Sequence, residues 1–153
     1  MWIWAAGVFV VDQATKWIVV HALDLRSVGA IDVLPPFFNL RMAWNRGINF
    51  GLFASDGDAA RWILIGVALA ICGWVVWWLR RSPQKWSVAI AAGLLLGGAL
   101  GNIVDRVIYG AVADFINMSC CGIDNPFAFN VADAAIFLGA FGLIFFWDEN
   151  KTA

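Results

Sequence analysis

Long runs of apolar residues dominate the hydrophobic pattern of the chain. Residues 62–79 and 86–104 contain no charged side chain. Because a helix rises ~1.5 Å per residue and the hydrocarbon layer is ~30 Å thick, about 20 largely apolar residues are enough to cross it. Both runs are therefore predicted to be transmembrane helices, and the very short segment between them predicts a helical hairpin.

Two further apolar runs are interrupted by ionisable side chains. Residues 2–23 are apolar except for Asp12, Lys16 and His21, and residues 131–147 except for Asp133. The first run lacks a basic segment in front of it, and an acidic residue inside the apolar part is unfavourable in a cleavable signal peptide. We interpret it as a retained helix, which gives four predicted spans within a single integral membrane domain, residues 1–153.

The charges between the two uninterrupted runs predict the orientation of the chain. Arg80, Arg81 and Lys85 put three positive charges and no negative one in that short loop. Such loops are typically cytoplasmic, and four spans leave both termini on the same side as this loop. We therefore expect a multi-pass membrane protein with cytoplasmic termini, and residues 24–60 and 106–130 on the outer side of the membrane.

One of the outer segments has the pattern of a strand. Apolar Phe38, Leu40, Met42 and Trp44 alternate with other residues, a period of two that is typical of a half-buried strand. A small amphipathic sheet on the membrane surface would accommodate it. The predicted fold class is an all-α membrane protein of four transmembrane helices with a small extracytoplasmic β-sheet.

Composition supports a membrane protein and excludes several functions. Of the 153 residues, 62% are hydrophobic and 14% are charged, with a net charge of −1. Globular domains have ~45–50% apolar and ~25% charged residues, so the excess apolar surface is expected to face lipid. A nucleic-acid partner is not expected at this charge. Three cysteines, two of them adjacent, form neither a disulfide framework nor a metal-ligand pattern, so neither a metal nor a cofactor is expected.

Ionisable groups within the predicted spans are the main functional signal. Each costs ~2.5–3.5 kcal/mol on insertion scales, so each is expected to have a partner or a purpose. Asp12 and Lys16 are four residues apart and share a helix face, which favours an ion pair that holds the first helix in the bundle.

The third span has small residues at every fourth position, which allow a neighbouring helix to approach closely. They are Ala89, Gly93, Gly97 and Gly101, and the next step of the stripe is Asp105. We expect this carboxylate to point into the bundle and to support a polar site together with Asn102 and Arg106.

Asp114 and Asp133 are the candidate catalytic pair. Asp114 follows the third span and Asp133 begins the fourth, so both are expected at the same membrane depth. Taken singly, Asp114 could be an ordinary loop carboxylate, and Asn130 with Asp133 could form a helix-capping box. Together, two neighbouring carboxyl groups would share one proton and supply an acid and a base, which is the chemistry of aspartic peptidases. His21 has no nucleophile nearby in the sequence that would suggest another mechanism.

Five motifs along the chain resemble those of the signal peptidase II family, the membrane aspartic peptidases that remove signal peptides from lipid-modified prolipoproteins. They are DQATK at 12–16, NRGINF at 45–50, GNIVDR at 101–106, VADF at 112–115 and FNVAD at 129–133. The resemblance implies that Asp114 and Asp133 are the catalytic dyad. The residues implied to line or support the site are Asp12, Lys16, Asn45, Gly47, Asn102, Asp105, Arg106 and Asn130.

The resemblance also implies a location in the bacterial inner membrane, with the active site near the outer, periplasmic face, and it implies the substrate and the partners. The substrate would be a prolipoprotein whose first mature residue is a diacylglyceryl-modified cysteine, cleaved on the N-terminal side of that cysteine. Membrane lipid and the cyclic peptide antibiotic globomycin would be further partners, and no cofactor is implied. Asn49 stands where the family pattern has a small Ala or Ser.

Two other functions are compatible with parts of the pattern. A small proton-coupled transporter would use Asp12 and Lys16 as a relay, but it gives no reason for polar residues to gather at the outer ends of the last two spans. A structural membrane subunit would have no use for so many ionisable groups in its spans. Loss of peptide cleavage on substitution of the two candidate acids would distinguish the peptidase from both.

Overall fold

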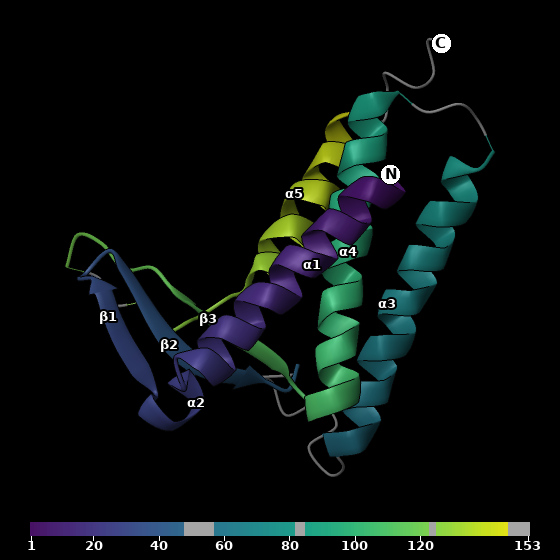
Figure 1. The fold of residues 1–153 in the computed structure, drawn as a ribbon. Coiled ribbons are helices and arrows are strands. Elements are labelled where there is room, and N and C mark those ends of the chain that lie inside the picture. The colour runs from purple at the N-terminus through teal and green to yellow at the C-terminus, as the bar shows by residue number, and fades with distance from the viewer. Residues whose placement is uncertain (48–56, 82–84, 123–124, 147–153) are drawn as a thin grey trace.

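The computed structural model describes residues 1–47, 57–81, 85–122 and 125–146. Figure 1 shows the long helices beside one another and a small sheet against one end of the bundle. In chain order the elements are α1 (Trp2–Trp17), the π-helical turn η1 (Ile18–Ala22), α2 (Leu25–Val28), β1 (Ala30–Leu34), β2 (Phe38–Asn45), α3 (Gly57–Leu79), α4 (Trp86–Tyr109), β3 (Val112–Asn117) and α5 (Val131–Phe145).

The described residues contain three helices that are long and apolar enough to cross a membrane: α1 with η1, α3, and α4. The fourth predicted span corresponds to α5, which has 15 residues between Val131 and Phe145. At ~1.5 Å per residue α5 is ~22 Å long, shorter than a hydrocarbon layer of ~30 Å. The prediction of a mostly helical protein with a small sheet is thus confirmed in its coarse form.

Two helices extend beyond the predicted apolar runs. Helix α3 begins at Gly57 rather than at residue 62, and α4 continues to Tyr109 rather than ending near residue 104. Hydropathy does not detect these ends because each contains charged residues. One of these, Arg61, joins the two ends, since its Nη2 donates to the carbonyl of Val107 at 2.7 Å. Gly110, at φ +76°, then ends α4 in the left-handed conformation that glycine adopts without strain.

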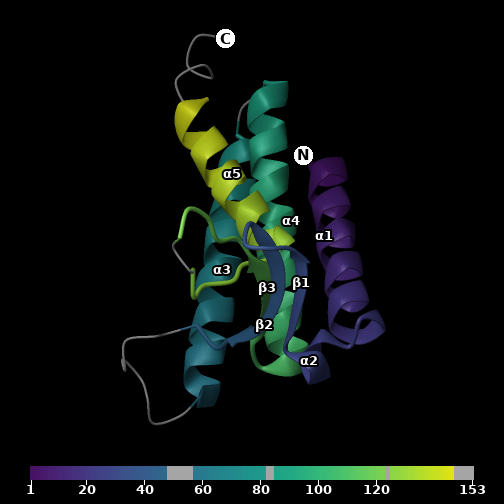
Figure 2. The same ribbon diagram turned by 90° about the vertical axis from the view of Figure 1, so that its left-hand side faces the viewer.

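Helix α4 is the centre of the bundle, with α1, α3 and α5 around it (Figure 2). The small residues of the stripe let α1 approach α4 closely, as predicted, and Gly98, outside the stripe, does the same for α5. A Cβ atom at Gly93 would lie 2.5 Å from Cβ of Trp4 on α1, and one at Gly98 would lie 2.5 Å from the carbonyl oxygen of Ala132 on α5. Larger side chains at these positions would therefore push α1 or α5 away from α4.

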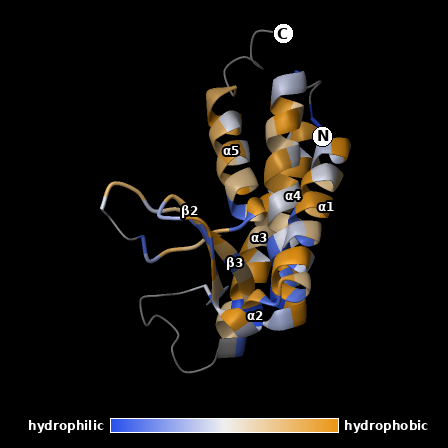
Figure 3. Ribbon diagram, turned by 60° about the vertical axis from the view of Figure 1, so that its left-hand side comes forward, coloured by the Kyte–Doolittle hydropathy of each residue, from blue (hydrophilic) through white to orange (hydrophobic). Residues whose placement is uncertain are grey.

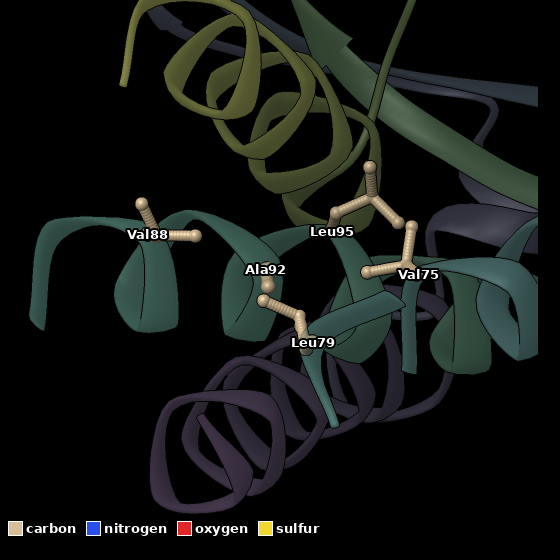
Figure 4. Close-up of a cluster of buried hydrophobic side chains, with 5 residues drawn as sticks. All are labelled: Val75, Leu79, Val88, Ala92 and Leu95. Carbon is tan, nitrogen blue, oxygen red and sulfur yellow. The ribbon is translucent and has the colours of Figure 1, made fainter. Parts of the chain in front are cut away.

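Near its C-terminal end, helix α3 packs on α4 through apolar side chains. A cluster of buried side chains, Val75, Leu79, Val88, Ala92 and Leu95, joins the two helices there (Figure 4). The helices are largely hydrophobic along their length (Figure 3). Exposed side chains such as Trp74, Trp77 and Phe141, each about half accessible, are suited to contact with lipid.

The sheet is antiparallel with the order β1-β2-β3. Strand β2 confirms the alternation found in the sequence, and Leu40 is buried with Val19, Leu25 and Phe115. Strand β3 was not predicted, because a strand buried on both faces has no alternating pattern. It places Asp114 in the sheet, whereas the sequence alone suggested a loop.

Candidate active site

Asp114 lies on β3, where it pairs with Ala43 of β2. Its side chain is almost fully buried, at 3% exposure for the residue. Asn45 Nδ2 donates to Oδ2 at 3.1 Å, and Asn130 Nδ2 donates to Oδ1 at 2.7 Å. Each carboxyl oxygen thus accepts a hydrogen bond from an asparagine that the sequence also assigned to the site.

Asp133 lies in the first turn of α5, and the predicted capping box is present. Asn130 Oδ1 accepts from the backbone N–H of Asp133 at 2.8 Å, and Asp133 Oδ2 accepts from the backbone N–H of Asn130 at 3.2 Å. Asn102 Nδ2 donates to the other oxygen, Oδ1, at 2.8 Å. Because the Asn130 side chain also donates to Asp114, this one residue forms hydrogen bonds with both acids.

Burial and the neighbouring Asp133 perturb the protonation of Asp114. The pKa of Asp114 is raised to about 7, first because the group is buried and then because of the charge of Asp133. A hydrogen bond with Asp133 raises the pKa further, while the bonds from Asn45 and Asn130 oppose the rise. At neutral pH the Asp114 carboxyl is therefore poised between its acid and its ionised form.

A buried ion cluster lies directly behind the pair. Lys16 Nζ is 2.8 Å from Oδ2 of Asp12 and 2.8 Å from Oδ2 of Asp105, and the three side chains are at most 6% exposed. The predicted ion pair between Asp12 and Lys16 is therefore present, with Asp105 as a third member. Lys16 Nζ also donates to Asn102 Oδ1 at 3.2 Å, and this bond orients the Asn102 amide so that its Nδ2 faces Asp133.

The two carboxylates of the cluster hold the backbone beside each candidate catalytic acid. Asp105 Oδ2 accepts from the N–H of Ala113 at 3.1 Å, and Asp12 Oδ1 accepts from the N–H of Ala132 at 2.9 Å. Ala113 and Ala132 immediately precede Asp114 and Asp133. The cluster thus connects α1 and α4 to both segments that carry the pair.

Gln13 belongs to the cluster, although the sequence analysis did not assign it to the site. Its Nε2 donates to Asp12 Oδ2 and to Asp105 Oδ1, both at 3.2 Å. The available signal was its place in the motif at 12–16, next to an acid inside an apolar helix.

Gly47 and Arg106 complete the predicted set of residues. Gly47, at φ +95°, donates its N–H to Asn45 Oδ1 at 2.9 Å and so holds the amide that contacts Asp114. Arg106 Nη1 donates to the carbonyl of Asn102 at 3.4 Å, and its charge interacts with Asp133 and Asp114. Its Nε is buried and has no hydrogen-bond partner among the described residues. Asn49 lies outside the described residues.

Two cavities meet this region. One of about 480 Å³ includes Asp114, Asn45 and Gly47 in its lining. The other, of about 400 Å³, lies between α3, α4 and α5, is mostly apolar, and has Asn102 and Arg106 among its lining residues. The polar network is therefore accessible both from the sheet and from an apolar groove in the bundle.

The remaining candidate groups are a metal site, His21 and the cysteines. The described residues contain no group of three or more His, Cys, Asp and Glu side chains that could hold a metal ion. His21 Nε2 is 3.4 Å from the hydroxyl of Tyr109, and the ring lines a cavity of about 240 Å³ on the side of the buried cluster that Lys16 and Asp105 also line. Cys72 is buried in the bundle, and Cys120 and Cys121 are exposed thiols.

The fold and the site together define a helical membrane protein with two interacting carboxyl groups, one buried and one partly buried, where a helix bundle meets a small sheet. The family model of signal peptidase (SPase) II matches residues 4–147. The chain belongs to the signal peptidase II family and is a multi-pass bacterial membrane protein.

Relatives and solved structures agree with this membership. A "Lipoprotein signal peptidase" of Sphingopyxis alaskensis is 48% identical over 143 residues, which cover 93% of this chain and 81% of that protein. One of Methylobacterium sp. is 42% identical, covering 96% and 88%. A solved structure described as a bacterial membrane enzyme aligns with a TM-score of 0.79 and 30% identity, covering 94% of this chain and 88% of that chain.

Proposed function

We propose that this protein is an aspartic endopeptidase that removes the signal peptide from diacylglyceryl-modified prolipoproteins, on the N-terminal side of the lipidated cysteine. Membership of the signal peptidase II family supports this reaction. The observation that carries the assignment of the site is the contact of Asn130 with both Asp114 and Asp133, together with the pKa of about 7 for Asp114.

The environments of the two acids suit different roles. Asp114, with its raised pKa, is the member that holds the proton at neutral pH. We assign the role of the base to Asp133, whose carboxyl oxygens accept hydrogen bonds from Asn102 Nδ2 and from a backbone N–H at the start of a helix. The carboxylate takes a proton from water as the water attacks the peptide carbonyl, and the protonated acid donates a hydrogen bond to the carbonyl oxygen. The departing amine then receives a proton from the pair.

We further propose that α5 is the fourth span and that both termini are cytoplasmic. The start of α1, the end of α3 and the start of α4 lie at one end of the bundle (Figure 1), next to Arg80 and Arg81. The positive-inside rule assigns that end to the cytoplasm. The sheet and the pair of acids lie toward the other end, which would then face the periplasm.

The depth of the site fits a lipidated substrate. Asp133 contacts Asn102, which is seven residues, or ~10 Å, before the end of α4 at Tyr109. The acids are therefore recessed below the outer end of the bundle rather than exposed at it. A cysteine that is anchored in the outer leaflet by diacylglycerol would hold the scissile bond at this level, with no need to extract the substrate from the membrane.

The apolar groove supports the same substrate. Its lining includes Leu64 and Ile71 of α3 and Ile136 of α5, and it ends at Asn102 and Arg106. We propose that it receives an apolar part of the signal peptide or an acyl chain of membrane lipid, and that globomycin-type inhibitors compete there. The binding free energy gained in the groove would position the scissile bond against the acids.

A proton-coupled transporter is disfavoured by family membership. It would also leave unexplained why both segments that carry the acids are fixed to the buried cluster by backbone hydrogen bonds, at Ala113 and Ala132. Rigid attachment suits a site whose reacting groups must be held in place.

The test is cleavage of a lipidated prolipoprotein peptide by purified protein in detergent. Asp114→Asn and Asp133→Asn should each lower the rate by ~100-fold or more, because each removes a group that transfers a proton. Asp58→Asn is the control, since the Asp58 side chain is 88% exposed and pairs only loosely with Arg61, at 3.8 Å. Full activity in either dyad variant, with the fold intact by circular dichroism, would refute the assignment.

A further inference from the structure

A second polar cavity, of about 280 Å³, lies beside the one that contains Asp114. Its lining residues come from α2, the end of β2 and the end of α4: Arg26, Trp44, Arg46, Tyr109 and Ala111. Trp44 and Arg46 also line the Asp114 cavity, so the two cavities adjoin. None of these five residues has been given a role in the reaction.

The cavity has an excess of positive charge. Among the described residues neither Arg26 nor Arg46 forms an ion pair. Asp24, the acid nearest to Arg26 in the sequence, instead accepts a hydrogen bond from Ser27 Oγ at 2.8 Å. Two guanidinium groups at one cavity favour an anion, and their planar donors match the oxygens of a phosphate.

The surroundings of the cavity favour a lipid over a small soluble anion. The rings of Trp44 and Tyr109 are 5.5 Å apart and tilted by 51°, and amphipathic aromatic side chains of this kind are typical of the membrane–water boundary. Val28 and Ile108, which are close in sequence to the lining residues, expose 60% and 63% of their surface. Acyl chains would cover such apolar side chains, whereas inorganic phosphate would leave them in water.

We propose that this cavity binds the phosphodiester headgroup of an anionic phospholipid. The two arginines contact the phosphate oxygens, the aromatic pair lies at the level of the glycerol, and the acyl chains run along the exposed apolar side chains of α2 and the end of α4. A lipid in this position fixes the sheet on the bilayer surface next to the proposed active site. Its binding does not depend on peptide cleavage, so the inference stands or falls separately from the proposed function.

The test is lipid binding by the full-length protein in an uncharged detergent, measured by native mass spectrometry. Phosphatidylglycerol and phosphatidylcholine are titrated against the parent and against the double variant Arg26→Gln/Arg46→Gln. The control is Arg41→Gln, because Arg41 is an exposed arginine of β2 that does not line the cavity. Circular dichroism confirms that the variants are folded.

The parent should bind phosphatidylglycerol about tenfold more tightly than phosphatidylcholine, given the electrostatic contribution of each arginine near an anionic headgroup. The double variant should lose this preference, and Arg41→Gln should keep it. An unchanged preference in the double variant, or an equal loss in Arg41→Gln, would overturn the proposal. Displacement of phosphatidylglycerol by an equal concentration of inorganic phosphate would overturn it as well, because the cavity would then be a site for free phosphate.

Discussion

Replacing Asp114 by Asn should abolish cleavage and yet stabilise the folded protein at alkaline pH. In the fold the pKa of Asp114 rises from its ordinary value of 3.8 to about 7, mainly because the carboxyl group is buried. Between these pH values the folded state holds a proton that the unfolded state has released, so stability falls as the pH rises. At ~1.4 kcal/mol per pKa unit, the full cost above about pH 7 is about 4 kcal/mol.

The variant removes this cost but disturbs the hydrogen bonds of the site. Asp114 accepts from Asn45 on one oxygen and from Asn130 on the other. An amide keeps one acceptor and turns the other oxygen into a donor, so one bond is lost at ~1–3 kcal/mol. The net expectation is a gain of ~1–3 kcal/mol above about pH 8, and no gain below about pH 4, where the native carboxyl is neutral in both states.

The assay is reversible unfolding by dodecyl sulfate in mixed micelles, followed by far-ultraviolet circular dichroism across this pH range. The parent should lose stability from acid to neutral pH with a slope that Asp114→Asn lacks. Asp58→Asn should keep the slope of the parent, since that carboxylate is exposed. Parallel curves for the parent and Asp114→Asn would refute the reasoning, because burial of Asp114 would then carry no protonation cost.

Three further predictions follow from the packing and the chemistry. Lys16→Met leaves two buried carboxylates without their cation and should lower the free energy of unfolding by ~3–5 kcal/mol; a loss below ~1 kcal/mol would contradict the buried ion cluster. Gly97→Val should destabilise the protein by ~1–3 kcal/mol because a side chain there meets Ala5 of α1, whereas Gly73→Ala, with open space around it, should be neutral or slightly stabilising; equal effects would contradict the packing. EDTA should leave cleavage unchanged in the prolipoprotein assay, and full inhibition would contradict a metal-free mechanism.

The elements that the sequence predicted well are those whose signal is local. The apolar runs identify the long helices, and the alternation around Leu40 identifies β2. The spacing of Asn130 and Asp133 predicts the capping box, which the structure confirms. Each of these depends on residues within a few positions of one another, so a single sequence contains the information.

The features that the sequence did not predict depend on long-range contacts. Strand β3 is buried on both faces and forms because β2 and the segment around Phe129 pair with it. The attachment of Ala113 to Asp105 and of Ala132 to Asp12 uses backbone N–H groups, which no side-chain pattern reveals. The candidate acids and their polar neighbours could therefore be proposed from the sequence, whereas the backbone contacts that hold the two segments could not.

The central claim is that Asp114 and Asp133 share a single proton at neutral pH. Infrared difference spectroscopy between about pH 6 and about pH 9 measures it directly, because a protonated carboxyl has its own carbonyl stretching band. The account predicts a band that disappears on titration through pH ~7 in the parent, is missing from that difference spectrum in Asp114→Asn, and titrates at lower pH in Asp133→Asn, because the neighbouring charge that raises the pKa of Asp114 is then gone. A band of unchanged amplitude in Asp114→Asn would contradict the account.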